Sequence, residues 1–108
     1  LSSTYVFLGD WQEDIDMLNK GIRLAEEALK EILSNEDAFT FNRGALLNNL
    51  GHSLYRKGEL LNDATLIKRG IEELNSAIEN FKFLKNENAI AETENLLNMA
   101  KKVLQKVV

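Results

Sequence analysis

The most constraining feature of this sequence is an internal repeat with a period of 49 to 50 residues. At an offset of 49, Gly9, Asp14, Gly21, Ile22 and Ala28 recur as Gly58, Asp63, Gly70, Ile71 and Ala77. At an offset of 50, Leu46, Leu47, Asn48 and Leu54 recur as Leu96, Leu97, Asn98 and Leu104. Such self-similarity marks repeat architectures, in which each unit buries its apolar face against the next. The repeat favours a binding role over catalysis.

The composition predicts an all-α fold in one domain spanning residues 1–108. The chain has 108 residues, 44% of them hydrophobic, which is enough for one continuous core in a small domain. It contains no proline, so no helix interior lacks an amide donor for that reason. Long stretches are rich in Leu, Ala, Glu, Lys and Asn, and most of these residues favour helices.

Charge and residue usage exclude several classes of function. The net charge of -4 argues against a general nucleic-acid binder, because such affinity rests on Lys and Arg at the phosphates. The chain has no cysteine, which excludes disulfides and zinc-thiolate sites. No stretch of roughly 18 apolar residues and no signal-type segment occurs, so we expect no membrane association and take the cytoplasm as the default compartment.

Apolar residues spaced three and four apart predict four long helices, at about residues 11–33, 38–57, 60–84 and 89–107. Gly9 and Asp10 are expected to break the chain and cap the first helix, and Gly58 to stop the second. Residues 1–7 match the end of the second helix, so we expect an N-terminal helix tail and a longer parent array. Phe41 is expected to pack in the core between successive hairpins.

The second and third predicted helices resemble the tetratricopeptide repeat family. Leu47, Leu50, Gly51 and Leu54 match the large residue, Leu-Gly pair and large residue of that family's first helix, and Gly70, Leu74 and Ala77 match the small, large, small pattern of its second. Glycine lacks a Cβ, so a partner helix can approach Gly51 closely. The resemblance implies a right-handed α-solenoid of antiparallel helix hairpins.

The sequence also departs from this family. The family unit has about 34 residues, so each repeat here is about 15 residues longer. Lys101 stands where the pattern expects glycine, and the closing proline is missing. The long period and the segments LSSTY, GD and RGALLNNLG are similar to the elongated arrays found beside caspase-like CHAT domains and in some signalling ATPases. That similarity implies a sensor or regulatory arm attached to an effector.

Polar residues on the first helix of each hairpin are the candidates for a concave binding groove. In the family register these are Asn48, Asn49, His52, Tyr55, Arg56, Asn98, Lys102, Gln105 and Lys106. The set matches the family's clamp for a peptide carboxylate only in part, because Asn48 replaces the key lysine. The basic members suit an acidic or extended peptide. The alternative is an ordinary solvated helix surface.

No catalytic, metal or cofactor site is expected. His52 is the single histidine and has no cysteine to activate, so ligand contact is its most specific role. The acidic run around Asp10 to Asp16 lacks the glycine and terminal glutamate of a calcium loop. We therefore expect a protein-binding or peptide-binding scaffold. The alternative is a spacer or sensor arm that self-associates through exposed repeat ends, with Val103, Leu104, Val107 and Val108 uncovered.

Overall fold

The protein is all-α, as the composition predicts. A computed structural model describes the backbone of residues 2–33 and 40–107 and the side chains of residues 12–32 and 40–107. Its helices are α1 (Ser2–Leu33), α2 (Phe41–Leu61), α3 (Ala64–Phe83) and α4 (Glu87–Val107), and these described ranges contain no strand. None of the described helices is both long and apolar enough to cross a membrane.

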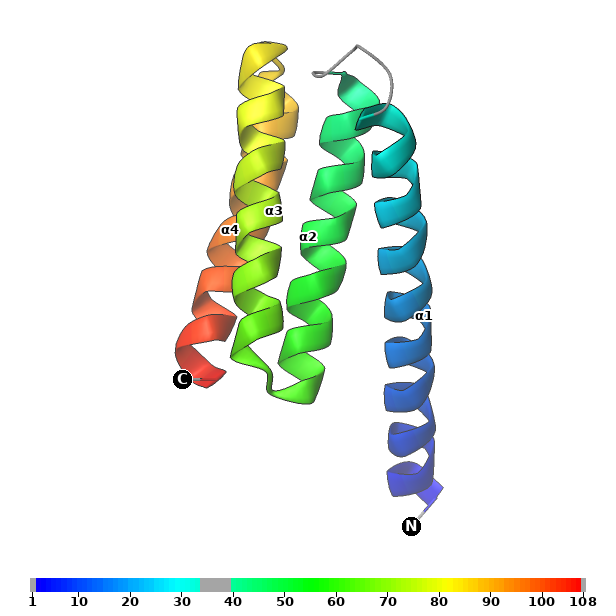
Figure 1. Ribbon diagram of the computed structural model, residues 1–108. Coiled ribbons are helices and arrows are strands. Elements are labelled where there is room, and N and C mark those ends of the chain that lie inside the picture. The colour runs from blue at the N-terminus through cyan, green and yellow to red at the C-terminus, as the bar shows by residue number, and fades with distance from the viewer. Residues whose placement is uncertain (1, 34–39, 108) are drawn as a thin grey trace.

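Consecutive helices run antiparallel, so α2 and α4 point in the same direction (Figure 1). Helix α2 is central: it contacts α1, α3 and α4, while α3 also contacts α4. The molecule is elongated, with principal extents of 53 × 27 × 23 Å. The first turns of α1 extend past the α2–α3 turn (Figure 1). This packing is consistent with a helical repeat or a helical bundle.

Three helix boundaries differ by four or more residues from the predicted ones: the start of α1, the end of α2 and the start of α3, which lies at Ala64 and not near residue 60. Helix α1 continues through Gly9 and Asp10, so the expected break and the separate N-terminal tail are wrong. Helix α2 continues through Gly58 and ends at Leu61, and its C-cap Asn62 adopts the left-handed conformation with φ 55°. A glycine weakens a helix by only about 1 kcal/mol, and packing readily outweighs that. Gly58 is in fact a buried packing position beside Ile67.

The first residues of α3 are held by a side-chain cap. The Asp63 carboxylate accepts hydrogen bonds from the backbone N–H groups of Thr65 and Leu66, at 3.0 and 3.3 Å. These amides have no partner within the helix, so the carboxylate satisfies them. Its negative charge also interacts favourably with the positive end of the helix dipole. The turn between α2 and α3 is therefore short and well defined.

The core forms on both sides of α2. One cluster joins α1, α2 and α3 and contains Ile22, Ala25, Leu29, Leu47, Leu50, Leu54, Ala77 and Phe81. A second joins α2, α3 and α4 and contains Tyr55, Ile67, Leu74, Ile78, Leu97 and Ala100. Val103, Leu104 and Val107 pack against this second cluster and are partly buried. They are thus less exposed than expected, because they pack against this cluster of α2, α3 and α4 residues. Val108 lies outside the described residues.

Helices α2 and α3 approach closely where Gly51 of α2 faces Gly70 of α3. A Cβ built on Gly70 would lie 2.7 Å from the carbonyl oxygen of Gly51, and one built on Gly51 would lie 2.7 Å from Leu74 Cγ. Neither position leaves room for a methyl group. The expectation that Gly51 admits the partner helix is confirmed.

Candidate functional site

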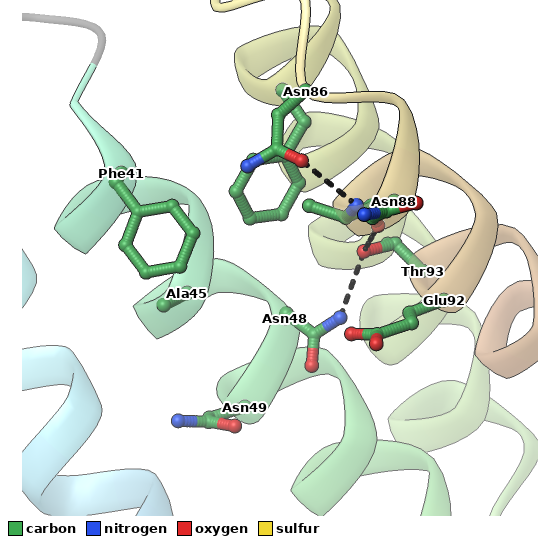
Figure 2. A pocket seen from close by; sticks show the side chains of 10 residues that line it. Phe41, Ala45, Asn48, Asn49, Asn86, Asn88, Glu92 and Thr93 are labelled. Carbon is green, nitrogen blue, oxygen red and sulfur yellow. Dashed lines mark hydrogen bonds between the residues drawn. The ribbon is translucent and has the colours of Figure 1, made fainter.

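A cleft of about 390 Å³ lies between the N-terminal halves of α2 and α4, beside the α3–α4 turn. Its lining comprises Phe41, Ala45, Asn48, Asn49, Phe81, Asn86, Asn88, Ala89, Glu92 and Thr93. We call it the asparagine cleft, since four of these residues are asparagines. Figure 2 shows their side chains around it.

One wall of the cleft is a hydrogen-bonded link between α2 and α4. The Asn48 side-chain amide donates to the Thr93 hydroxyl at 2.8 Å, and that hydroxyl donates to the Ala89 carbonyl at 2.8 Å (Figure 2). Thr93 is fully buried. Asn86 caps α4 by accepting a hydrogen bond from the Ala89 N–H at 3.1 Å. The link fixes the position of Asn48 relative to α4.

Other polar side chains of the cleft are exposed. Within the described residues, Asn49, Asn88 and Glu92 make no side-chain hydrogen bond or ion pair. Each asparagine amide offers both donors and an acceptor, which is the pattern a peptide backbone presents. These groups can therefore exchange water for a polar ligand without breaking a bond within the fold.

The apolar part of the cleft includes two phenyl rings. Phe81 is buried in the core, whereas Phe41 is 58% exposed, and the ring centroids lie 5.9 Å apart at 53°. The expectation that Phe41 packs in the core is wrong, because it occupies the first turn of α2 and only one of its sides meets α3. An exposed ring beside amides suits an apolar ligand side chain.

A buried amide anchors the start of α2 next to Phe41. Asn80 of α3 is fully buried, donates to the Thr40 carbonyl at 2.8 Å and accepts from the Arg43 guanidinium at 3.0 Å. The Thr40 hydroxyl in turn accepts from the Arg43 backbone N–H at 3.1 Å, as an N-cap. The mouth of the cleft is thus held by α3. Sequence reasoning missed this network, since an Asn among apolar residues carries no periodic signal.

The predicted groove residues of α2 occupy different environments. Asn48 and Asn49 line the asparagine cleft, while His52 is exposed beside α1. Partial burial, and then the charge of Arg56, lowers the pKa of His52. Arg56 is exposed and pairs with Glu59 at 3.5 Å. Tyr55 does not belong to the exposed face: it is 1% exposed and part of the core.

The predicted groove residues of α4 are all exposed. Thr93, Leu97 and Ala100 form the buried stripe of this helix. Asn98, Lys102, Gln105 and Lys106 lie off that stripe, and none lines the asparagine cleft. Helices α2 and α4 run parallel, and two pairs of exposed residues occupy corresponding positions on them, 50 residues apart. The pairs are His52 with Lys102 and Arg56 with Lys106.

No family model matches the chain, and no match is found among curated proteins or solved structures. The resemblance to tetratricopeptide repeats therefore rests on the residues of the repeat. The described residues also contain no group of three or more His, Cys, Asp or Glu side chains placed to hold a metal ion.

Proposed function

We propose that this chain is a scaffold module of the tetratricopeptide type that binds an extended protein segment in the asparagine cleft. The observation that carries the proposal is the combination of four asparagines with the exposed Phe41 ring between two parallel helices. Amides match the donors and acceptors of a peptide backbone, and an apolar surface gives a side chain of the segment a place to bury.

Charge favours an acidic segment. Arg56, Lys102 and Lys106 are exposed, and Arg56 and Lys106 occupy corresponding positions on α2 and α4. The pair between Arg56 and Glu59 is itself exposed, so it contributes little and can yield to a ligand carboxylate. Glu92 brings one negative charge to the cleft itself, which suits a neutral or amide-rich portion of the same segment there.

The helix arrangement also supports a solenoid in which these helices form the concave face, and we propose the right-handed form that the family resemblance implies. Each helix contacts its sequence neighbour, and the first helices of the two hairpins, α2 and α4, contact each other. Preformed helices hold the cleft residues in place, so the flexible segment bears most of the ordering entropy.

Binding of labelled peptides tests the proposal. A set of extended peptides, acidic and neutral, is titrated with the protein and followed by fluorescence anisotropy. We expect acidic members to bind, Phe41→Ala combined with Asn49→Ala to weaken them about tenfold, and Arg56→Ala combined with Lys102→Ala to weaken acidic members selectively. Lys68→Ala, on the exposed surface of α3, is the matched control. Equal affinity of all variants would refute the assignment of the cleft.

An assembly role is the second candidate, as a self-associating spacer or a sensor arm of an attached effector. It is favoured by exposed apolar residues on α1, where Met17 is 73% and Leu24 is 55% exposed. Light scattering across a concentration series separates the two: a constant monomer mass favours the binding module, and a rising mass favours assembly. Neither role involves catalysis or a cofactor, and both suit the cytoplasm.

A further inference from the structure

Nothing in the described fold requires a glycine at position 21. It lies inside α1, is exposed, and a Cβ built on it would meet only the Ser53 hydroxyl oxygen, at an ordinary contact distance of 3.7 Å. No described glycine has a positive φ, so the backbone does not require glycine either. A glycine inside a helix is destabilising by about 1 kcal/mol relative to alanine.

The internal repeat explains the glycine at position 21. Gly70 is the equivalent of Gly21, 49 residues later, and there the glycine is necessary: a Cβ would lie 2.7 Å from the Gly51 carbonyl oxygen and 2.9 Å from the Tyr55 nitrogen. The backbone of α2 crosses α3 at this point. By equivalence, Gly21 is suited to a second helix crossing α1.

Neighbouring positions show the same difference between the two helices. Ala77 is completely buried, whereas its equivalent Ala28 is only partly buried. Leu66 packs against the core, whereas its equivalent Met17 is 73% exposed. Gly70, Ala77 and Leu66 are thus covered in the fold, whereas their equivalents on α1 are more open. We call Met17, Gly21, Leu24 and Ala28 the α1 face.

The α1 face continues into a cleft of about 490 Å³ between α1 and α2. On the α2 side this cleft is lined by Leu46, Asn49, His52 and Ser53. Leu46 and Ser53 are the equivalents of Leu96 and Val103 on α4, which pack against the core cluster that contains Tyr55 of α2. A helix in this cleft would thus contact α1 and α2 together, as α2 contacts α3 and α4.

We propose that the α1 face binds an amphipathic α-helix of the α2 type, whose glycine crosses α1 at Gly21. The matching pattern on α2 is Gly51 with Leu47 four residues before it and Leu54 three residues after it. A helix with a side chain at the glycine position would be held away from α1, because the equivalent crossing of α2 and α3 leaves no room for a Cβ on Gly51. The partner is therefore a helical segment, in contrast to the extended segment proposed for the asparagine cleft.

The test uses a labelled synthetic peptide with the sequence of Phe41–Leu61 and the intact chain. We expect saturable binding by anisotropy with a gain of helical circular dichroism. Gly21→Leu in the protein should weaken binding at least about tenfold, and Gly51→Leu in the peptide should do the same. Gly21→Leu leaves the fold intact, because only Ser53 lies near the new Cβ and leucine favours the helix. Glu27→Leu, at an exposed position of α1 outside the face, is the matched control.

Each result decides the proposal. Loss of binding with Gly21→Leu and retention with Glu27→Leu would support it. Equal binding by both variants would overturn it, as would no binding by a chain that stays monomeric. A dimer that Gly21→Leu dissociates would overturn the α2-type partner and identify a second copy as the occupant. Extended acidic peptides bound at the asparagine cleft should still bind Gly21→Leu, so failure of one proposal is distinguishable from failure of the other.

Discussion

The side-chain amide of Asn80 donates a 2.8 Å hydrogen bond to the backbone carbonyl of Thr40, and this bond joins the last turn of α3 to the N-cap of α2. Asn80 is completely buried, and its oxygen accepts from Arg43 at 3.0 Å. In a low-dielectric interior such a satisfied amide contributes to stability, while its partners become costly if it is removed. The start of α2, and with it Phe41, depends on this residue.

Asn80→Ala is therefore expected to destabilise the protein by about 1 to 3 kcal/mol, since the Thr40 carbonyl loses a buried donor. Urea unfolding followed by circular dichroism measures the change. Asn75→Ala, at an exposed position of the same helix, should shift the midpoint only slightly. If the two variants unfolded at the same urea concentration, the amide would have no structural role.

Tyr55→Phe is expected to keep or raise stability, by up to about 1 kcal/mol. The Tyr55 hydroxyl is buried and has no hydrogen-bond partner among the described residues, and an unsatisfied polar group in the interior is destabilising. Thermal unfolding of the two proteins measures the difference. Peptide affinity should stay unchanged because the side chain does not reach the surface. A marked loss of stability would reveal a partner for the hydroxyl.

Gly70→Ala and Gly21→Ala should have opposite effects on stability. At Gly70 the new methyl group would meet the Gly51 carbonyl, a backbone atom that cannot move alone, so we expect a loss of about 1 to 3 kcal/mol. At Gly21 the site is open, so alanine should stabilise α1 by up to about 1 kcal/mol. Denaturant midpoints of both variants test the pair, and changes of the same sign would contradict the helix crossing described for Gly70.

Glu73→Gln should raise stability at neutral pH. Partial burial raises the pKa of the Glu73 carboxyl above its ordinary value of 4.5, and Arg69 only partly opposes this. The folded state then holds the proton more tightly than the unfolded state, so the contribution of this group is fully present below pH 4.5 and is lost as pH rises through the folded pKa. The urea concentration at the unfolding midpoint, measured from pH 4 to 7, should fall less steeply with rising pH for Glu73→Gln than for the original protein. Parallel curves would show that the carboxyl does not titrate abnormally.

Much of the fold could be predicted because helix formation and repeat register are local properties. The spacing of apolar residues identified the helices, and the lack of a Cβ at Gly51 identified where α2 meets α3. Helix ends were harder to predict. Gly58 looked like a stop signal, yet it is buried beside Ile67 and the helix continues to Leu61, since packing outweighs the small intrinsic cost of glycine.

The candidate site could be predicted only in part. Asn48 was found because it recurs as Asn98, and Asn49 because it partly matches the family's peptide clamp; both line the asparagine cleft. No sequence signal pointed to the other polar residues of the cleft, which are Asn86, Asn88 and Glu92. They lie in the α3–α4 turn and the first turns of α4, and they approach α2 only because α4 folds back along α3. Tyr55 was misplaced on the surface, because α2 is covered by three helices and its buried side is wider than one apolar stripe.

The sequence by itself thus determined an all-α chain, its 49- to 50-residue repeat and the pair Gly51 and Gly70 at which α2 meets α3, because these follow from side-chain spacing and size along a single helix. Only the tertiary structure decided which polar side chains are buried, which amides line a cleft and which glycine is left uncovered. Those properties depend on how many neighbours surround each helix, and residues distant in the chain supply the neighbours.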